Sequence, residues 1–141
     1  MSMTGLEVFD TTVHKTNSWL KEVMQGIHRD DRRKAYLAMR ATLHALRDRL
    51  TIEEVAQLGA QLPMLIRGFY YEGWDPTRKP LKLRDREEFL ALIDEEFRIV
   101  ETLNPELIAR AVFTVLANRV TAGEIADVKH VLPEEIRDLW P

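Results

Sequence analysis

The chain has 141 residues, of which 45% are hydrophobic and 30% charged, and this composition is ordinary for one water-soluble globular domain. It contains no cysteine, which excludes disulfide frameworks and thiolate metal sites and favours a reducing compartment such as the cytoplasm. The net charge of −3 argues against a general nucleic-acid binder, because such proteins usually carry a basic excess.

No segment of the sequence has the pattern of a membrane-spanning helix. The longest apolar run extends from Ala111 to Ala117, whereas a spanning helix needs about 20 apolar residues. The segment from Met1 to Phe9 lacks the basic stretch and apolar core of a secretory signal. We therefore expect no membrane insertion and a cytoplasmic location.

The first half of the chain predicts four helices. We expect an opening helix over residues 9–27 and a long helix over residues 31–49, which has apolar residues at three- and four-residue steps. Thr51 and Glu54 have the spacing of a capping box, in which each side chain accepts a hydrogen bond from the other residue's backbone amide. A short helix therefore begins there. Pro63 begins the last helix, because proline suits a first helical turn and disrupts a continuing one.

A non-helical linker is expected over residues 72–83. Gly73, Pro76 and Pro80 prevent a regular helix in this segment. Aromatic and basic side chains are concentrated within and just before it. We select six residues of this region as candidate binding residues: Arg67, Tyr70, Tyr71, Trp74, Arg78 and Lys79.

Two roles are open for the aromatic and basic residues of the linker. They could dock a protein partner, because aromatic and arginine side chains are the commonest interface hot spots. Alternatively, Tyr71 and Trp74 pack back into a groove and fasten the linker, while the basic residues stay solvated. We favour this second role, because a long linker in a compact domain is usually tied down. We also favour a structural role for Arg67, at the C-terminal end of its helix.

The second half of the chain repeats this helical pattern. We expect an opening helix over residues 85–100 and a long helix over residues 104–119, which starts with an asparagine cap followed by proline. Thr121 and Glu124 form a second capping box, and Pro133 begins another last helix. Neither half contains an alternating, β-branched segment bounded by turns. The predicted fold class is therefore all-α.

An internal repeat organises the chain. When the sequence is shifted by 70 residues, segment 40–70 aligns with segment 110–140 without a gap, and eleven of the 31 positions are identical. We therefore predict one domain over residues 1–141, a compact helical bundle of two tandem homologous units with about four helices each. Copy one covers about residues 9–71 and copy two about residues 84–140, on either side of the linker.

Patterns associated with catalysis or metal binding are weak in this sequence. His28-Arg29-Asp30 matches three residues of a protein-kinase catalytic loop, but the other kinase motifs are missing from the sequence. None of the four histidines has another histidine at helical spacing, as zinc sites on helices usually have. We predict no catalytic residue, no metal and no cofactor.

The segment from Tyr70 to Trp74, with the sequence Tyr-Tyr-Glu-Gly-Trp, is followed by a basic, proline-containing stretch to Lys82 and then by Glu87 to Leu90. In these features the chain resembles a bacterial family of uncharacterised proteins, domain of unknown function 2267. The resemblance covers about Phe9 to Trp140. It implies a helical bacterial domain with no established activity, so no functional residue is carried over from the family.

The function that we expect is that of a non-enzymatic helical interaction module of a bacterial cytoplasmic protein. The alternative is a small-molecule-binding protein or an enzyme, with a site in the cleft between the two copies. A deep cleft lined by Arg67, Arg137, Tyr70 and a histidine would favour that alternative. Nucleic-acid binding through the basic linker is disfavoured by the acidic second half of the chain.

Overall fold

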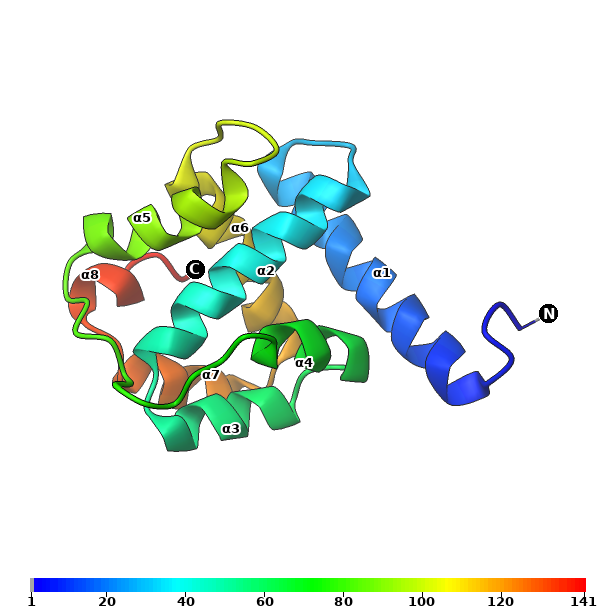
Figure 1. Cartoon of the computed structure of the whole chain (residues 1–141), viewed down its shortest axis with the longest axis horizontal. Helices are drawn as coiled ribbons and strands as arrows, with labels where there is room; N and C mark the ends of the chain where they lie inside the picture. The colour runs from blue at the N-terminus through cyan, green and yellow to red at the C-terminus, as the bar shows by residue number, and fades with distance from the viewer. Residues whose placement is uncertain (1) are drawn as a thin grey trace.

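The computed structural model describes residues 2–141, which form α-helices and no strand (Figure 1). The prediction of an all-α fold is confirmed. Within these residues no helix has both the length and the apolar content to cross a membrane. The helices are α1 (Glu7–Ile27), α2 (Arg32–Arg49), α3 (Ile52–Ala60), α4 (Met64–Tyr71), α5 (Arg86–Phe97), α6 (Pro105–Arg119), α7 (Ala122–His130) and α8 (Glu134–Arg137).

The four longest helices make the body of the molecule. α1 packs on both α2 and α6, and α5 packs on the same two helices. α2 crosses the middle of the molecule, with α6 behind it in the view of Figure 1. Its buried side chains recur at three- and four-residue steps, as the sequence pattern predicted. They include Ala35, Ala38, Met39, Leu43 and Leu46.

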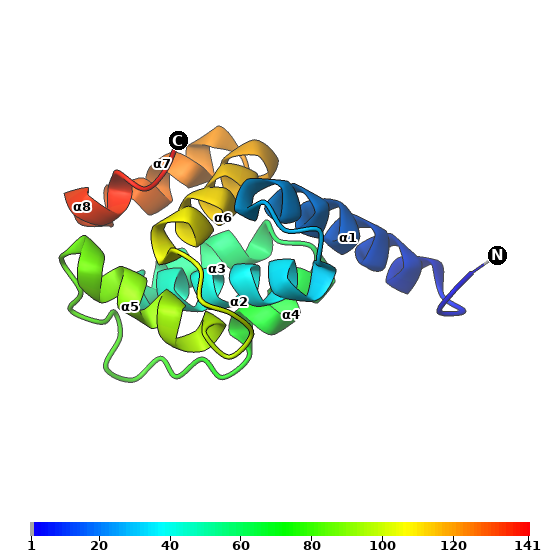
Figure 2. The ribbon, with the colours of Figure 1, turned by 90° about the horizontal axis from the view of Figure 1, so that it is seen from above.

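α1 crosses α6 very closely at Gly26. A Cβ atom placed on Gly26 would lie 2.7 Å from the Cβ atom of Ala111. Only a residue without a side chain permits this approach. The first half of α1, in contrast, projects away from the body in both Figures 1 and 2. The apolar side chains Leu6, Val8 and Phe9 are about half-exposed there.

The helix starts follow the capping signals in the sequence. Asp31 caps α2, Asp85 caps α5 and Asn104 caps α6, each through a side-chain oxygen that accepts a backbone amide hydrogen. The expected end of the second opening helix at Val100 is wrong, since α5 ends at Phe97. Residues 98–100 form turns that lead into the loop before α6.

The two capping boxes form only in part. Thr51 Oγ1 accepts a hydrogen bond from Glu54 N at 3.2 Å, and Thr121 Oγ1 accepts one from Glu124 N at 3.3 Å. The sequence also predicted bonds from the threonine amides to the glutamate carboxylates. This prediction is wrong, because neither bond forms within residues 2–141. Thr121 N donates instead to Gln61 Oε1 at 3.0 Å. Both glutamates are buried where α3 packs on α7, and there they contact each other.

Residues 70 positions apart make matching contacts. Arg67 Nε donates to Gly59 O at 2.7 Å, and Arg137 Nε donates to Lys129 O at 3.1 Å. In both cases the arginine of the last helix binds a carbonyl near the end of the short helix before it. The pattern of buried and exposed residues over positions 50–70 is also nearly the same as that over positions 120–140.

Two shallow grooves correspond in the same way. One of about 390 Å³ lies between α2 and α5, and the other of about 440 Å³ lies between α1 and α6. Every residue that lines the first groove has a counterpart 70 positions away that lines the second. Their chemistry differs: His44, Asp48, Glu95 and Glu96 in the first correspond to Thr114, Asn118, Gln25 and Gly26 in the second.

Candidate functional site

The aromatic candidate residues of the linker region lie together and pack inward. The Tyr70 side chain is fully buried, and its hydroxyl donates to Val55 O at 2.9 Å. Burial raises the pKa of this hydroxyl. The rings of Tyr70 and Tyr71 meet edge to face at 4.9 Å, and the ring of the half-buried Trp74 lies 5.7 Å from that of Tyr71. These three side chains form one cluster on the core.

The basic candidate residues do not join this cluster. Arg67 binds the carbonyl groups of Gly59 and Leu62 at the end of α3. Arg78 is exposed and Lys79 is half-exposed. Within residues 2–141 neither Arg78 nor Lys79 forms an ion pair. Only the aromatic members of the set are therefore brought together.

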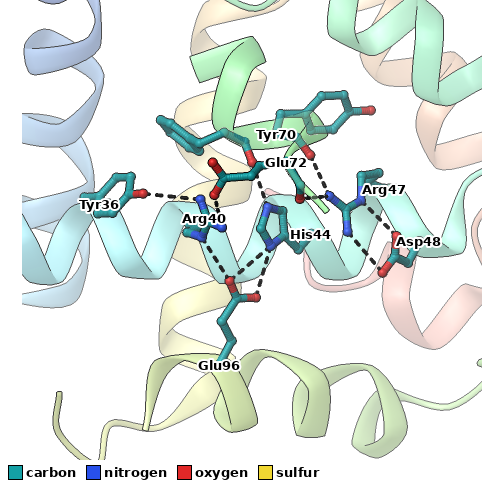
Figure 3. A network of polar contacts seen from close by, with 9 residues as sticks. Tyr36, Arg40, His44, Arg47, Asp48, Tyr70, Glu72 and Glu96 are labelled. Carbon is teal, nitrogen blue, oxygen red and sulfur yellow. Dashed lines mark hydrogen bonds and ion pairs between the residues drawn. The ribbon is translucent and has the colours of Figure 1, made fainter. Parts of the chain in front are cut away.

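A network of charged side chains on α2 holds α4, the start of the linker and α5 (Figure 3). Arg40 pairs with Glu72, just after α4, and its Nε atom lies 3.3 Å from a carboxylate oxygen of Glu96 on α5. Arg40 Nη1 also donates to the Tyr36 hydroxyl at 3.3 Å. One guanidinium group therefore links α2 to two other parts of the chain.

His44 lies between two hydrogen-bond acceptors in this network (Figure 3). Its Nδ1 atom is 3.0 Å from Glu96 Oε1, and its Nε2 atom is 2.7 Å from Phe69 O. A carboxylate and a backbone carbonyl are both acceptors, so each ring nitrogen of His44 faces an acceptor. Burial opposes ionisation of Glu96, but the hydrogen bond from His44 and the nearby Arg40 charge outweigh it and lower the pKa of Glu96.

Arg47 closes the C-terminal end of α4 from a buried position. Its Nη1 atom donates to Tyr70 O at 2.8 Å and to Glu72 O at 2.9 Å. These carbonyl groups belong to a helix end, where intrahelical partners are missing. Asp48 lies 2.8 Å from Arg47 Nε and compensates its charge. The network therefore fixes α4 and the first linker residues on α2.

An open groove of about 740 Å³ lies between α1, α2 and α4. The charged network fixes its wall, because Tyr36 and Glu72 both bind Arg40 and the Phe69 carbonyl binds His44. The Tyr36 and Phe69 rings meet edge to face at 5.2 Å. The groove is lined by Thr16, Asn17, Leu20, Arg32, Arg33, Tyr36, Leu65, Gly68, Phe69 and Glu72.

The groove combines apolar surface with a few polar groups. The Thr16 side chain is only 4% exposed, and its hydroxyl has no hydrogen-bond partner among residues 2–141. Arg32 and Arg33 are exposed on the rim, and within the same residues neither forms an ion pair. An apolar concavity of this volume with a few convergent polar groups is typical of small-molecule sites.

A wider hollow of about 830 Å³ continues along α1 from the groove, with which it shares Asn17 and Arg32. Its remaining lining is rich in basic side chains, and Asp30 is the one acidic residue that lines it. The open end of the groove is therefore cationic. The basic side chains are His14, Lys21, His28, Arg29 and Arg32.

Three carboxyl groups cluster where α3 meets α7. One oxygen atom from each of Glu54, Glu124 and Asp127 lies within 4.8 Å of the others. Burial, together with the hydrogen bond and charge of Glu54, raises the pKa of Glu124 to about 8. Carboxylate oxygens are ligands for hard cations, whereas the raised pKa of Glu124 favours its neutral form. In that form one carboxyl group of the pair can donate to the other.

The sequence interpretation selected neither the groove nor the glutamate pair. The sequence did contain a signal for the pair, because Glu54 and Glu124 are identical residues at matching positions of segments 40–70 and 110–140. Thr16, Arg32 and Leu65 come from three different helices, and no local pattern links them. The groove could be found only from the tertiary structure.

Comparison with known proteins identifies the family of the chain. Among curated proteins no match is found. A family model described as "Uncharacterized conserved protein (DUF2267)" matches residues 16–139. The matched segment contains every residue that lines the groove between α1, α2 and α4. The chain belongs to this DUF2267 family.

Proposed function

We propose that the chain is a duplicated helical unit, with copy one over about residues 9–71 and copy two over about residues 84–140 in a single domain. The matching contacts of Arg67 and Arg137 support this organisation, as do the corresponding grooves. The absence of cysteine supports a location in the bacterial cytoplasm. Superposition of segments 40–70 and 110–140 in an experimental structure tests the duplication, which different helix orders would contradict.

We propose that the protein is a non-enzymatic binding module that holds a small organic ligand in the groove between α1, α2 and α4. The observation that carries the proposal is the open, largely apolar groove between three helices, with the Tyr36 and Phe69 rings in its wall. The groove belongs to copy one, whereas the sequence suggested a small-molecule site in the cleft between the copies.

The corresponding position in copy two is occupied by a side chain of the protein itself. Arg86 stands 70 residues after Thr16. Its guanidinium group donates to Glu135 O and to Glu106 Oε1, both at 3.4 Å, and so joins α5, α6 and α8. Threonine is too short to make such a bridge. Among residues 2–141, the bridge that Arg86 makes in copy two has no counterpart at Thr16 in copy one.

A fragment screen on the full chain, observed by ¹H–¹⁵N correlation spectra, tests the proposed function. We expect ligands whose signals cluster on α1, α2 and α4. Gly68→Phe should abolish these shifts because it places a ring in the groove, and a Cβ atom at Gly68 meets no other atom within 4 Å. Gly123→Phe is the matched control at an equally open helical position. Shifts that are scattered, or that survive Gly68→Phe, would overturn the proposal.

A second candidate function is the docking of a protein partner through the linker. The exposed Arg78, which has no ion pair within residues 2–141, supports it. The half-burial of Trp74 beside Tyr71 supports the structural alternative instead. Charge reversal in the linker, described in the Discussion, separates the two.

A further inference from the structure

The groove between α1, α2 and α4 has an apolar floor and a cationic rim. Leu20 and Phe69 are buried in the floor, while Leu65 on α4 is 45% exposed beside them. Arg32 and Arg33 lie on the rim at the first turn of α2. This rim and floor define the chemistry of a ligand, and the inference drawn from them rests on the proposed function.

The charge around the groove is almost entirely positive. The acidic residue that lines the groove is Glu72, and its carboxylate already pairs with Arg40. The hollow that continues from the groove adds Lys21 and also Asp30, while its Arg29 pairs with Glu101. An anion that enters the groove therefore meets unpaired cations, whereas a cationic ligand would be repelled.

Copy two provides an internal comparison with the opposite charge. Thr102 and Leu103 stand at the positions that correspond to Arg32 and Arg33. Conversely, acidic residues replace neutral ones: Glu106, Glu135 and Asp138 in copy two correspond to Tyr36, Leu65 and Gly68 in copy one. In copy two the Glu106 carboxylate binds a cation of the protein, Arg86. In copy one the cations line the rim and the space between the helices is open.

We infer that the groove binds an anionic amphiphile. Its carboxylate or phosphate group lies against Arg32 and Arg33, and its apolar chain lies over Leu20, Leu65 and Phe69. The ligand is a free molecule in solution, since the groove volume of about 740 Å³ suits one small molecule.

Titration of the ¹⁵N-labelled full chain with two single-chain amphiphiles tests this inference. Sodium decanoate and decyltrimethylammonium have tails of equal length and opposite head charges, and both are used below their micelle-forming concentrations. We expect decanoate to shift the groove signals and decyltrimethylammonium to shift them much more weakly. Gly68→Phe should abolish the decanoate shifts, and Gly123→Phe should leave them unchanged.

The double variant Arg32→Glu, Arg33→Glu should weaken decanoate binding by roughly tenfold, the change expected for the loss of two exposed ion pairs. Acidic residues suit the first turn of a helix, so this variant should fold. The matched control is Lys82→Glu, Arg84→Glu, which makes the same charge change at exposed linker positions. Equal loss of binding in the control would overturn a specific role for the rim arginines.

Two further outcomes separate this inference from the proposed function. If decyltrimethylammonium or neutral fragments bind in the groove as tightly as decanoate, the inference of an anionic ligand is wrong. The proposed binding module then still stands. If nothing binds in the groove in either experiment, both the proposed function and this inference are wrong.

Flotation with phosphatidylglycerol vesicles distinguishes the source of the ligand. Flotation without binding of monomeric decanoate would overturn a free amphiphile in favour of a membrane surface.

Discussion

Carboxyl oxygen atoms of Glu54 and Glu124 lie within 4.8 Å of each other between α3 and α7, although the two residues stand 70 positions apart in the chain. Each is buried, and each has one carboxyl oxygen without a partner among residues 2–141. Both residues lie in the first turn of their helix, as the fourth residue of a capping motif. Their side chains nevertheless turn toward each other. Two buried carboxyl groups in contact cannot both ionise at low cost.

This contact predicts a stability that falls as the pH rises from about 4.5 to about 8. The pKa of Glu124 is about 8 in the folded chain, above its ordinary value of 4.5. Its contribution to stability is therefore complete below about pH 4.5 and is lost as the pH rises through about 8. Glu124→Gln should raise the melting temperature at pH 9 by several degrees, as about 1–2 kcal/mol would in a domain of this size, and change it little at pH 5.

Thermal melts followed by circular dichroism at both pH values check this prediction. Glu53→Gln, an exposed neighbour of Glu54 on α3, is the control and should leave the pH profile unchanged. A Glu124→Gln profile parallel to that of the unmodified chain would show that the pair does not hold a proton.

Arg47 should be one of the most sensitive positions in the protein. Arg47→Met leaves the Tyr70 and Glu72 carbonyl groups without their donor and Asp48 without its partner. We expect a loss of about 2–4 kcal/mol in the free energy of unfolding, measured by urea denaturation. Arg47→Lys keeps the charge but cannot serve both carbonyl groups and Asp48 at once, so an intermediate loss is expected. An unchanged stability in Arg47→Met would refute the closing role assigned to this side chain.

Trp74→Ala tests the structural role of the aromatic linker residues. Trp74 is half-buried against the Tyr71 ring, so its truncation should cost about 1–3 kcal/mol, less than the loss for a fully buried tryptophan. Trp74→Phe preserves the ring contact and should recover most of the loss. Urea denaturation of both variants gives the comparison. Near-normal stability of Trp74→Ala would contradict the structural role and support the docking role of the linker.

Charge reversal of Arg78 and Lys79 tests that docking role directly. The double change to glutamate should alter stability by less than about 0.5 kcal/mol, since Arg78 is exposed and neither residue has an ion pair within residues 2–141. If a partner docks on the linker, its capture from the native cell lysate should weaken, and more so at low salt, where exposed charges act over a longer range. Capture that is the same for both proteins would assign the linker to structure alone.

Residues 1–75 should not fold alone. α1 and α2 both pack on α6, and α2 also packs on α5, so the truncated chain would expose the faces that these helices cover. We expect poorly dispersed NMR signals or association rather than a stable monomer. A monomeric fragment with dispersed signals would show that copy one is a separate folding unit.

Local signals in the sequence predicted the helix starts, because the groups that cap a helix lie within a few residues of its first turn. Pro63, Pro133 and Asn104 each stand at the expected helix boundary. The second half of each capping box failed, because burial between α3 and α7 brought Glu54 and Glu124 together. The groove could not be predicted either, since its lining comes from three separate helices, α1, α2 and α4.

Because α1 and α6 cross so closely at Gly26, the two proposed copies cannot have the same residue at this position. The position 70 residues later is Glu96, which binds His44 and Arg40 on α2. A glutamate at position 26 would collide with Ala111, and a glycine at position 96 would release α5 from the charged network. The residues at positions 26 and 96 are therefore not interchangeable. A chain with two identical halves would either clash with Ala111 at position 26 or lack the contacts of Glu96 with His44 and Arg40.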